Sequence, residues 1–324
     1  MIEFLSEYGL FLAKVGTVVI ALLVVIGFGV ATTKRGAQHD GLEVENLNRR
    51  FQKLGDAIRR STQSKAKFKK SSKEQRKVDK KRDKEGSERK RVFVLDFKGD
   101  LRATATASLR EEVSAVLAVA TEEDQILVRL ENSGGAVHEH GLAASQLLRI
   151  RKQGVPLIVC VDKVAASGGY LMACVADRIL AAPFAIIGSI GVVAQLPNFN
   201  RLLEERGVDV EQITAGKHKR TLTMFGKNTD EGREKLKEEL EDVHELFKSQ
   251  IAEHRSQIDI EVVATGEYWY GLRAVEVNLV DEIQTSDDYL IGAAEDHDLY
   301  SVVYKRRRPL PERLMGSVDS LLSR

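Results

Sequence analysis

The first group in this 324-residue chain whose type and spacing could do chemistry is Ser167, in the stretch VAASGGY. Its surroundings are almost wholly apolar, and a short helix is predicted to start directly after it. The N-terminus of a helix carries free N–H groups and partial positive charge, and glycines let a ligand approach the backbone closely. Such a serine could attack a carbonyl carbon while a nearby N–H holds the oxyanion. The alternative is a small residue at a tight, buried junction.

A nucleophilic serine needs a group that takes its proton, and the residues alone leave this choice open. Histidine is one alternative, because two histidines follow a second glycine turn, NSGG. Lysine is the other, provided that burial or a nearby cation keeps the amine neutral. The pattern GxSxG is absent, since Ala165 and Gly169 stand two positions from the serine. The candidate bases are His138, His140, His218, Lys163, Lys217, Lys219 and Lys227.

No metal or cofactor is predicted. His138 and His140 are not accompanied by further ligands at zinc spacing. Cys160 and Cys174 both lie in apolar runs, without a CxxC pattern, and are predicted to be buried free thiols.

These residues belong to a globular body that begins sharply at Arg91 and is predicted to extend over residues 91–300. Apolar strand patterns alternate there with helical patterns, which indicates an α/β fold with a parallel sheet. Ligand sites in such folds lie where strands end and helices begin, and both glycine turns, NSGG and AASGG, occupy such places. A long amphipathic helix is predicted from about Thr229 to Arg255 after a polar loop. Residues 301–324 are predicted to be a basic, loosely held tail.

The N-terminal part has a different character. After a short flank, residues 1–8, an apolar run over residues 9–31 is long enough to cross a bilayer. Its acidic start, MIEFLSEYG, favours an uncleaved anchor over a signal peptide. Basic residues follow the run, so the positive-inside rule would place the body in the cytoplasm.

A basic arm joins this anchor to the body. Residues 32–91 contain 21 Lys and Arg against 9 Asp and Glu, a formal charge of +12, whereas residues 92–324 carry −10. Residues 32–60 are predicted to be an amphipathic helical segment, because its apolar residues alternate at steps of three and four; it could pair with copies of itself or lie on anionic lipid. Residues 61–90 are predicted to be a basic flexible linker. Nucleic-acid binding is not expected, since interleaved aromatic residues are scarce. The apolar residues of the predicted helical segment over residues 32–60 are Val44, Leu47, Phe51, Leu54 and Ile58.

Four ordered motifs give the chain a specific resemblance. VDKVAASGGYLMACVAD, GSIGVV, ITAGKHKRTLT and GEYWYGLRAVEVNLVDEI resemble segments of the signal peptide peptidase A family of membrane serine proteases. The anchor, the basic arm and a single protease domain resemble one branch of that family. The resemblance covers nearly the whole chain and implies a Clp protease/crotonase-like layered βαβ spiral.

The resemblance also implies a Ser–Lys dyad. By motif, Ser167 is the nucleophile, Lys219 of GKHK is the general base, and Ser189 of GSIG orients the lysine. The oxyanion hole would be formed by the N–H groups of Gly134 and of Ser167 itself. The family's SPGG turn reads NSGG here, with Ser133 in place of the proline.

The family's properties complete the expectation. Its members cut short apolar peptides, such as signal-peptide remnants, and they form rings in which neighbouring subunits complete each active site. The resemblance implies a single-pass protein of the inner membrane with a periplasmic catalytic domain, with the cytoplasmic face as the alternative. Two other functions are weighed against it. One is a crotonase-like acyl-CoA enzyme, and the other is a catalytically weak, peptide-binding membrane scaffold.

Overall fold

The computed structural model describes residues 9, 14–20, 41–85 and 89–306. The chain divides into two units, and the larger one, called the compact unit below, spans Leu42–Tyr304. The predicted anchor, residues 9–31, lies for the most part outside the described residues. No helix among the described ones is both long and apolar enough to cross a membrane.

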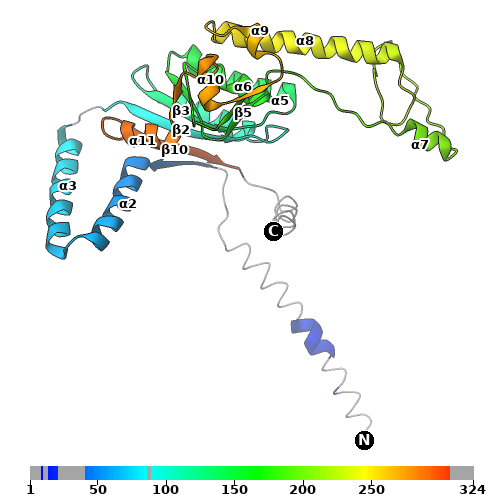
Figure 1. Cartoon of the computed structure of the whole chain (residues 1–324). Coiled ribbons are helices and arrows are strands. Elements are labelled where there is room, and N and C mark those ends of the chain that lie inside the picture. Colours follow the sequence, from blue (N-terminus) through cyan, green and yellow to red (C-terminus); the bar gives the residue numbers. More distant parts are fainter. Residues whose placement is uncertain (1–8, 10–13, 21–40, 86–88, 307–324) are drawn as a thin grey trace, which may run out of the picture. The chain divides into compact units, whose positions relative to one another are not determined.

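A seven-stranded sheet forms the centre of the compact unit (Figure 1). Its order is β1-β10-β2-β3-β4-β6-β9, and the registered pairs from β10 to β9 are all parallel. The α/β class with a parallel sheet is therefore confirmed. The central strands are continuous apolar runs because both of their faces are covered. The bounds are β1 Gly41–Asn46, β2 Arg91–Lys98, β3 Gln125–Glu131, β4 Leu157–Val161, β6 Arg178–Ala181, β9 Glu282–Ile283 and β10 Asp298–Lys305.

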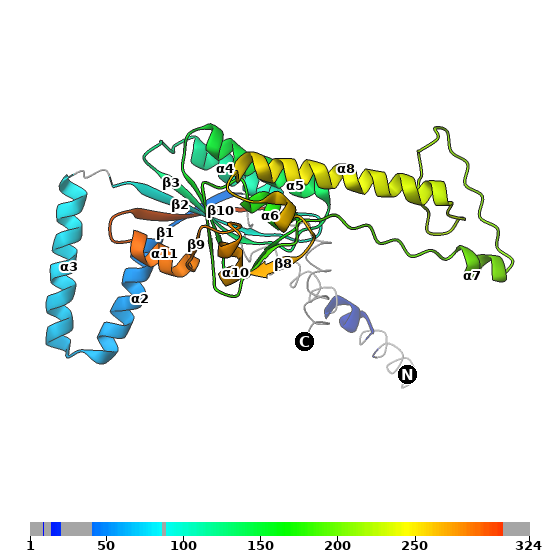
Figure 2. The same cartoon turned by 45° about the horizontal axis from the view of Figure 1, so that its top comes forward.

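Helices cover the two faces of this sheet, as both views show (Figures 1 and 2). On one face, α4, α5 and α6 enclose the larger apolar core, which includes Phe97, Leu130 and Tyr170. On the other face, α2 and α11 cover a smaller core around Leu127 and Leu299. The helix bounds are α2 Leu47–Thr62, α4 Thr106–Leu117, α5 Val137–Lys152, α6 Gly168–Ala173 and α11 Ser286–Ala293.

The remaining helices are α3 Lys65–Glu85, α7 Asn200–Glu205, α8 Asp230–His254, α9 Ile260–Val263 and α10 Gly271–Glu276. The predicted long helix is confirmed as α8, and Thr229 caps it by accepting a hydrogen bond from the N–H of Gly232. Its far end is fixed by Arg255, whose guanidinium is buried and forms two 2.8 Å bonds to Asp281. The helix is thus held at both ends.

A second, three-stranded sheet places the site. It has the order β5-β7-β8 and consists of β5 Val164–Ala166, β7 Ile186–Gly188 and β8 Tyr268–Tyr270. β5 runs parallel to β7, with Ala166 opposite Gly188. Both glycine turns of the sequence follow strand ends and precede helices, as predicted: NSGG lies between β3 and α5, and AASGG leads from β5 into α6.

Three predicted segments differ from the structure. In the helical segment predicted over residues 32–60, Gly41–Asn46 form strand β1 at the edge of the sheet beside β10, and helix α2 follows from Leu47; residues 32–40 lie outside the described residues. The linker predicted over residues 61–90 contains α3; its many Lys, Glu and Arg residues are good helix formers, and no Gly or Pro interrupts them. The tail predicted from residue 301 begins later, because residues 301–305 complete β10. Residues 307–324 of that tail lie outside the described residues.

Candidate active site

Ser167 occupies a strained position at the end of β5. Its backbone angles are φ +52° and ψ −121°, and it is the residue directly before α6. Few non-glycine residues adopt such a conformation, and it costs of the order of 1–3 kcal/mol. Strain of this kind is common where a side chain must be presented to a ligand. The side chain is half-buried, so its hydroxyl has access to the pocket beside it.

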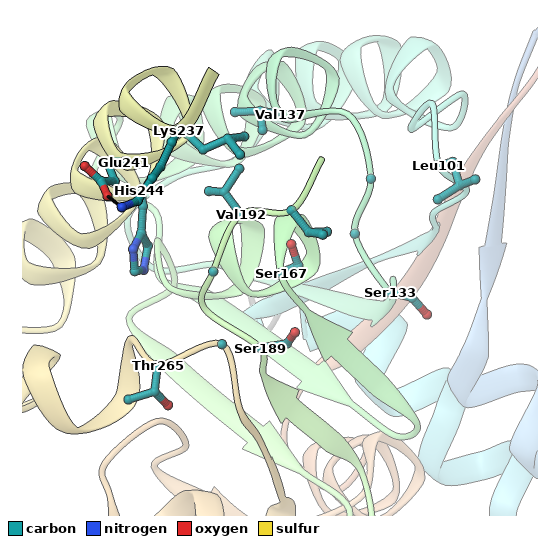
Figure 3. Close-up of a pocket in the computed structure, with 16 residues that line it drawn as sticks. Leu101, Ser133, Val137, Ser167, Ser189, Val192, Lys237, Glu241, His244 and Thr265 are labelled. Carbon is teal, nitrogen blue, oxygen red and sulfur yellow. Dashed lines mark ion pairs between the residues drawn. The ribbon is translucent and has the colours of Figure 1, made fainter. Parts of the chain in front are cut away.

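Ser189 lies next to Ser167 because β5 and β7 are paired. Ala166 is opposite Gly188, so the two serines follow their strands at equivalent positions. Ser189 also has a positive φ, +49°, and its N–H donates to the carbonyl of Glu267 at 2.7 Å. Both serines line the same pocket (Figure 3). The sequence places them 22 positions apart, and the strand register brings them together.

The turn Asn132–Gly135 lies directly against the nucleophile. A Cβ on Gly134 would come within 2.8 Å of both the Ser167 Cβ and the Gly168 nitrogen, so only glycine fits there. Gly134 also has a φ of +88°, which glycine adopts without strain. The glycine turn therefore lies beside Ser167 in the structure.

The predicted oxyanion donors are both engaged by other groups. The N–H of Ser167 donates to the carbonyl of Gly188 at 2.7 Å, as part of the β5–β7 pairing, and so is not free to hold an oxyanion. The Gly134 N–H donates to the side-chain oxygen of Asn132 at 2.9 Å. Gly168 is the first residue of α6, and its N–H has no hydrogen-bond acceptor among the described residues. The second candidate oxyanion donor is therefore the N–H of Gly168 and not that of Ser167, because a helix N-terminus leaves this N–H free.

Asn132 and His140 form a buried polar pair beneath this turn, which the sequence did not single out for this purpose. Asn132 is 1% exposed and His140 is fully buried. The ring nitrogens of His140 face the Ala136 carbonyl at 2.9 Å and the Asn132 side-chain oxygen at 3.2 Å. Both ring nitrogens are thereby directed away from the Ser167 hydroxyl. The alternative in which His140 is the base of a triad does not fit this arrangement.

A pocket of about 800 Å³ extends from the two serines to α8 (Figure 3), and it is called the polar pocket below because charged side chains of α8 line it beside apolar ones. Lys237, Glu241 and His244 project from α8 on the wall opposite the serines. Lys237 lies 3.9 Å from Glu241, a loose pair of exposed side chains. None of these three was predicted from the sequence, where they stand on the polar face of an amphipathic helix.

A second cavity, of about 220 Å³, also borders Ser167 and shares part of its lining with the first pocket. Its walls come from α5, α6 and α8, and no charged side chain lines it. Leu148, Leu171, Leu246 and Phe247 are among its apolar lining residues. A cavity of this size, smaller than a typical small-molecule pocket, is suited to one apolar side chain.

Lys219 is not part of either cavity that Ser167 lines. It is exposed, as are all residues from Glu211 to Arg220, and its N–H closes a turn on the Gly216 carbonyl at 3.2 Å. Its neighbour Lys217 is paired with Glu231 at the start of α8, at 2.9 Å. Within a single chain the predicted dyad is therefore not assembled. Of the other candidate lysines, Lys163 forms a 3.1 Å bond to Glu131, the last residue of β3.

The two cysteines are buried free thiols, as predicted. Burial raises the pKa of each thiol to about 12, so neither is a thiolate near neutral pH.

Comparison with known proteins identifies the family of the chain. The model of the N-terminal part of peptidase family S49 matches residues 3–147, and that of peptidase family S49 matches residues 149–300. The chain is 43% identical over 321 residues to "Probable protease SohB" of Haemophilus influenzae, covering 95% of this chain and 91% of that protein. It is 57% identical over 235 residues to the protein of the same name from Buchnera aphidicola subsp. Acyrthosiphon pisum, covering 72% and 70%.

Among solved structures, a mutant of the 1510-N membrane-bound stomatin-specific protease in complex with a substrate peptide aligns with a TM-score of 0.45 and 12% identity. The alignment covers 71% of this chain and 98% of that one. On the strength of the family models and the long, well-covered relatives, the chain belongs to peptidase family S49 and is a serine peptidase.

Proposed function

We propose that this serine peptidase is a membrane-anchored endopeptidase that uses Ser167 and Lys219 to cut short apolar peptides. The observation that carries the proposal is the position of Ser167. It is held in a strained turn and lines both the polar pocket and the uncharged cavity, with a glycine turn against it. The Clp protease/crotonase-like spiral that the family resemblance implies is part of the same proposal.

The reaction follows from the groups around Ser167. The neutral amine of Lys219 takes the proton of the Ser167 hydroxyl while the oxygen attacks the peptide carbonyl. The resulting oxyanion is held by the N–H of Gly168 and by that of Gly134. The protonated lysine then gives its proton to the leaving amine. Finally the lysine activates a water molecule, which releases the acyl group from Ser167.

Lys219 must then come from a neighbouring subunit. A general-base lysine has to be neutral, and burial favours the neutral form, whereas Lys219 is exposed in the single chain. An apolar side chain of the segment that carries it is exposed as well, since Ile213 is 92% exposed. Insertion of this segment into the next subunit of a ring would bury both the lysine and this side chain. This supports the family-type assembly in which subunits share sites.

The substrate class is inferred from the cavity beside Ser167. Its apolar lining and lack of charge favour an aliphatic residue before the cleaved bond, and they disfavour Lys, Arg, Asp and Glu there. Signal-peptide remnants and misfolded envelope proteins supply such residues. The predicted anchor would hold the enzyme in the inner membrane beside these substrates, with the body on the periplasmic side. Protease accessibility of the body in right-side-out spheroplasts tests that placement, and full protection would move the site to the cytoplasm.

The proposal is tested by cleavage of an apolar peptide by the full chain in detergent. Ser167→Ala and Lys219→Ala should each abolish cleavage and leave the fold intact by circular dichroism. Lys237→Ala is the matched control, because Lys237 lines the pocket of its own chain. It should keep most of the activity. Normal turnover by the Lys219 variant together with loss in the Lys237 variant would assign the base to Lys237 instead.

A second candidate function is a peptide-binding scaffold of low catalytic activity. The observation in its favour is that the Gly134 N–H is occupied by Asn132. A fluorophosphonate probe that labels the wild-type protein and spares Ser167→Ala would exclude it. A scaffold would bind apolar peptides equally well with and without Ser167, and would cleave none of them.

A further inference from the structure

Asn132 is the centre of a closely fitted polar cluster behind Ser167. Its side-chain oxygen accepts from the Gly134 N–H at 2.9 Å, and its side-chain nitrogen lies 3.3 Å from the Met172 Sδ. Its backbone N–H donates to the Val164 carbonyl, and its carbonyl accepts from the Ala166 N–H. Asn132 therefore joins the glycine turn to the strand that carries the nucleophile.

Three glycines pack closely against this cluster, at positions where a Cβ atom would clash with it. A Cβ on Gly99 would come within 2.4 Å of the Asn132 Cγ, and one on Gly168 within 2.5 Å of the His140 Cγ. A Cβ on Gly169 would come within 2.1 Å of the Asn132 carbonyl oxygen. The side chains of Asn132 and His140 thus fill space that a larger residue at Gly99 or Gly168 would occupy, and Gly169 leaves room for the Asn132 backbone carbonyl.

His140 is the second member of the cluster, and two hydrogen-bond acceptors face its ring. Its ring nitrogens face two acceptors, the Ala136 carbonyl through Nδ1 and the Asn132 oxygen through Nε2. A neutral imidazole carries a single N–H, so these two oxygens compete for it. The Asn132 side-chain oxygen can therefore accept a hydrogen bond from His140, from the Gly134 N–H, or from both.

These hydrogen bonds matter for catalysis because they determine whether the Gly134 N–H is bonded to Asn132 or available to the oxyanion. In the structure this N–H is bonded to Asn132, so it is not available to an oxyanion at Ser167. For it to act in the hole it must leave Asn132, and a buried oxygen that loses its donor is costly. His140 lies close enough to remain the donor to that oxygen after Gly134 has left.

We propose that Asn132 and His140 are positioning residues that hold the glycine turn in a resting conformation and ease its change to the one that binds the oxyanion. Asn132 holds the Gly134 N–H at rest. His140 keeps the Asn132 oxygen hydrogen-bonded when that N–H turns to the substrate. The inference rests on the proposed Ser167 peptidase activity and names two residues beyond the dyad.

Two substitutions of one residue test the pair. His140→Gln places an N–H near the Nε2 position and keeps the bond to Asn132. His140→Asn places one near Nδ1 and keeps only the bond to Ala136. Both lose the ring that packs on Gly168, so their difference isolates the contact with Asn132. For the full chain in detergent, with a peptide substrate, the Asn variant should lose roughly 10- to 100-fold in kcat. The Gln variant should stay within about threefold of wild type.

Further readouts separate positioning from folding. KM should change by less than about twofold in both variants, since the hole stabilises the transition state and not the bound substrate. A peptide aldehyde, which forms a tetrahedral adduct with serine, should bind the Asn variant more weakly by the same factor as kcat falls. Thermal melting verifies that both variants are folded. Equal kcat values for the two folded variants, or a loss confined to KM, would overturn the inference.

Asn132→Asp is a second test if His140→Asn does not fold. A carboxylate holds an N–H more strongly than an amide does, so kcat should fall at unchanged KM; an unchanged or higher kcat contradicts the proposal. Wild type and Ser167→Ala are measured alongside. Absence of serine-dependent cleavage in the wild type itself would refute the proposed function. An active wild type, together with Asn132 and His140 variants whose kcat equals that of the wild type, would refute only this inference.

Discussion

At Ser167 the backbone adopts a conformation that glycine accepts and other residues resist. The strain is maintained by the Ser167 N–H bond to Gly188 and by the start of α6, both of which the neighbouring strands and helix fix. The free energy stored there is the cost of presenting one hydroxyl to the pocket. Removal of the side chain should therefore affect stability and activity in opposite directions.

Ser167→Gly and Ser167→Ala separate these two effects. Both should be inactive, because both lack the hydroxyl. The glycine variant should melt a few degrees higher than the alanine variant, because about 1 kcal/mol of backbone strain is relieved. Differential scanning of the two variants measures this. A glycine variant that melts below the alanine variant would mean that the turn is not strained.

A second residue that affects stability is Glu112, on α4, whose protonation equilibrium is shifted in the folded protein. It is 4% exposed, and its carboxylate accepts from the Tyr304 N–H at 2.8 Å. Burial raises the pKa of Glu112 to about 7; the Tyr304 N–H acts in the opposite direction, and Asp96 adds a smaller upward effect. The folded state therefore binds a proton that the unfolded chain has released, so stability falls as the pH rises from about 4.5 to about 7.

Glu112→Gln removes this titration and keeps an oxygen for Tyr304. The wild-type protein should lose up to about 3 kcal/mol of stability through Glu112 between pH 5 and pH 8. The variant should lose less, and the other titrating groups cancel in the comparison. The measurement is the melting temperature of both proteins at the two pH values. Parallel changes in the two proteins would contradict a raised pKa of Glu112.

At the scale of elements, α8 connects the polar pocket to the apolar cavity. Lys237 and His244 line the pocket, while Val243, Leu246 and Phe247 line the cavity. Because α8 is capped by Thr229 and fixed through Arg255, it forms a wall of defined position. We therefore expect α8 to determine which residue is accepted before the cleaved bond.

Leu246→Asp tests this role. Leu246 is 64% exposed and lines the cavity, so a carboxylate there should leave the fold intact. The kcat/KM for a peptide with leucine before the cleaved bond should fall roughly tenfold, and that for lysine should rise. Ile291→Asp, on the other face of the sheet and 61% exposed, is the control. Equal effects of the two variants would exclude the cavity as a specificity site.

At the scale of the whole molecule, the separation of Lys219 from Ser167 predicts a shared site. If a neighbouring subunit supplies the lysine, mixing Ser167→Ala with Lys219→Ala should restore cleavage, because Ser167 of one chain meets Lys219 of the other. In randomly mixed rings, about a quarter of the sites would combine both residues. Peptide cleavage after co-expression of differently tagged chains measures this. A co-purified mixture that stays inactive would mean that each chain uses its own lysine.

The α/β class, the start of the body at Arg91, α8 and the two glycine turns could all be predicted from the sequence. These features depend on local patterns of apolar residues, on caps and on glycines, and local patterns can be recognised along the chain. Two of the three segments that differ from the prediction depend on distant partners, whereas α3 follows from local helix propensity. Residues 41–46 form a strand because β10 lies beside them, and residues 301–305 belong to β10 because β2 pairs with it.

By itself, the sequence determined the candidate nucleophile, through a serine at a glycine-rich strand end, and the family, through four ordered motifs. Only the tertiary structure decided which backbone groups are free. The pairing of β5 with β7 uses the Ser167 N–H and leaves that of Gly168, and the packing of α5 under the turn brings His140 to Asn132. Such facts depend on the register of strands and on the contacts of buried side chains far apart in the chain, and no local pattern encodes them.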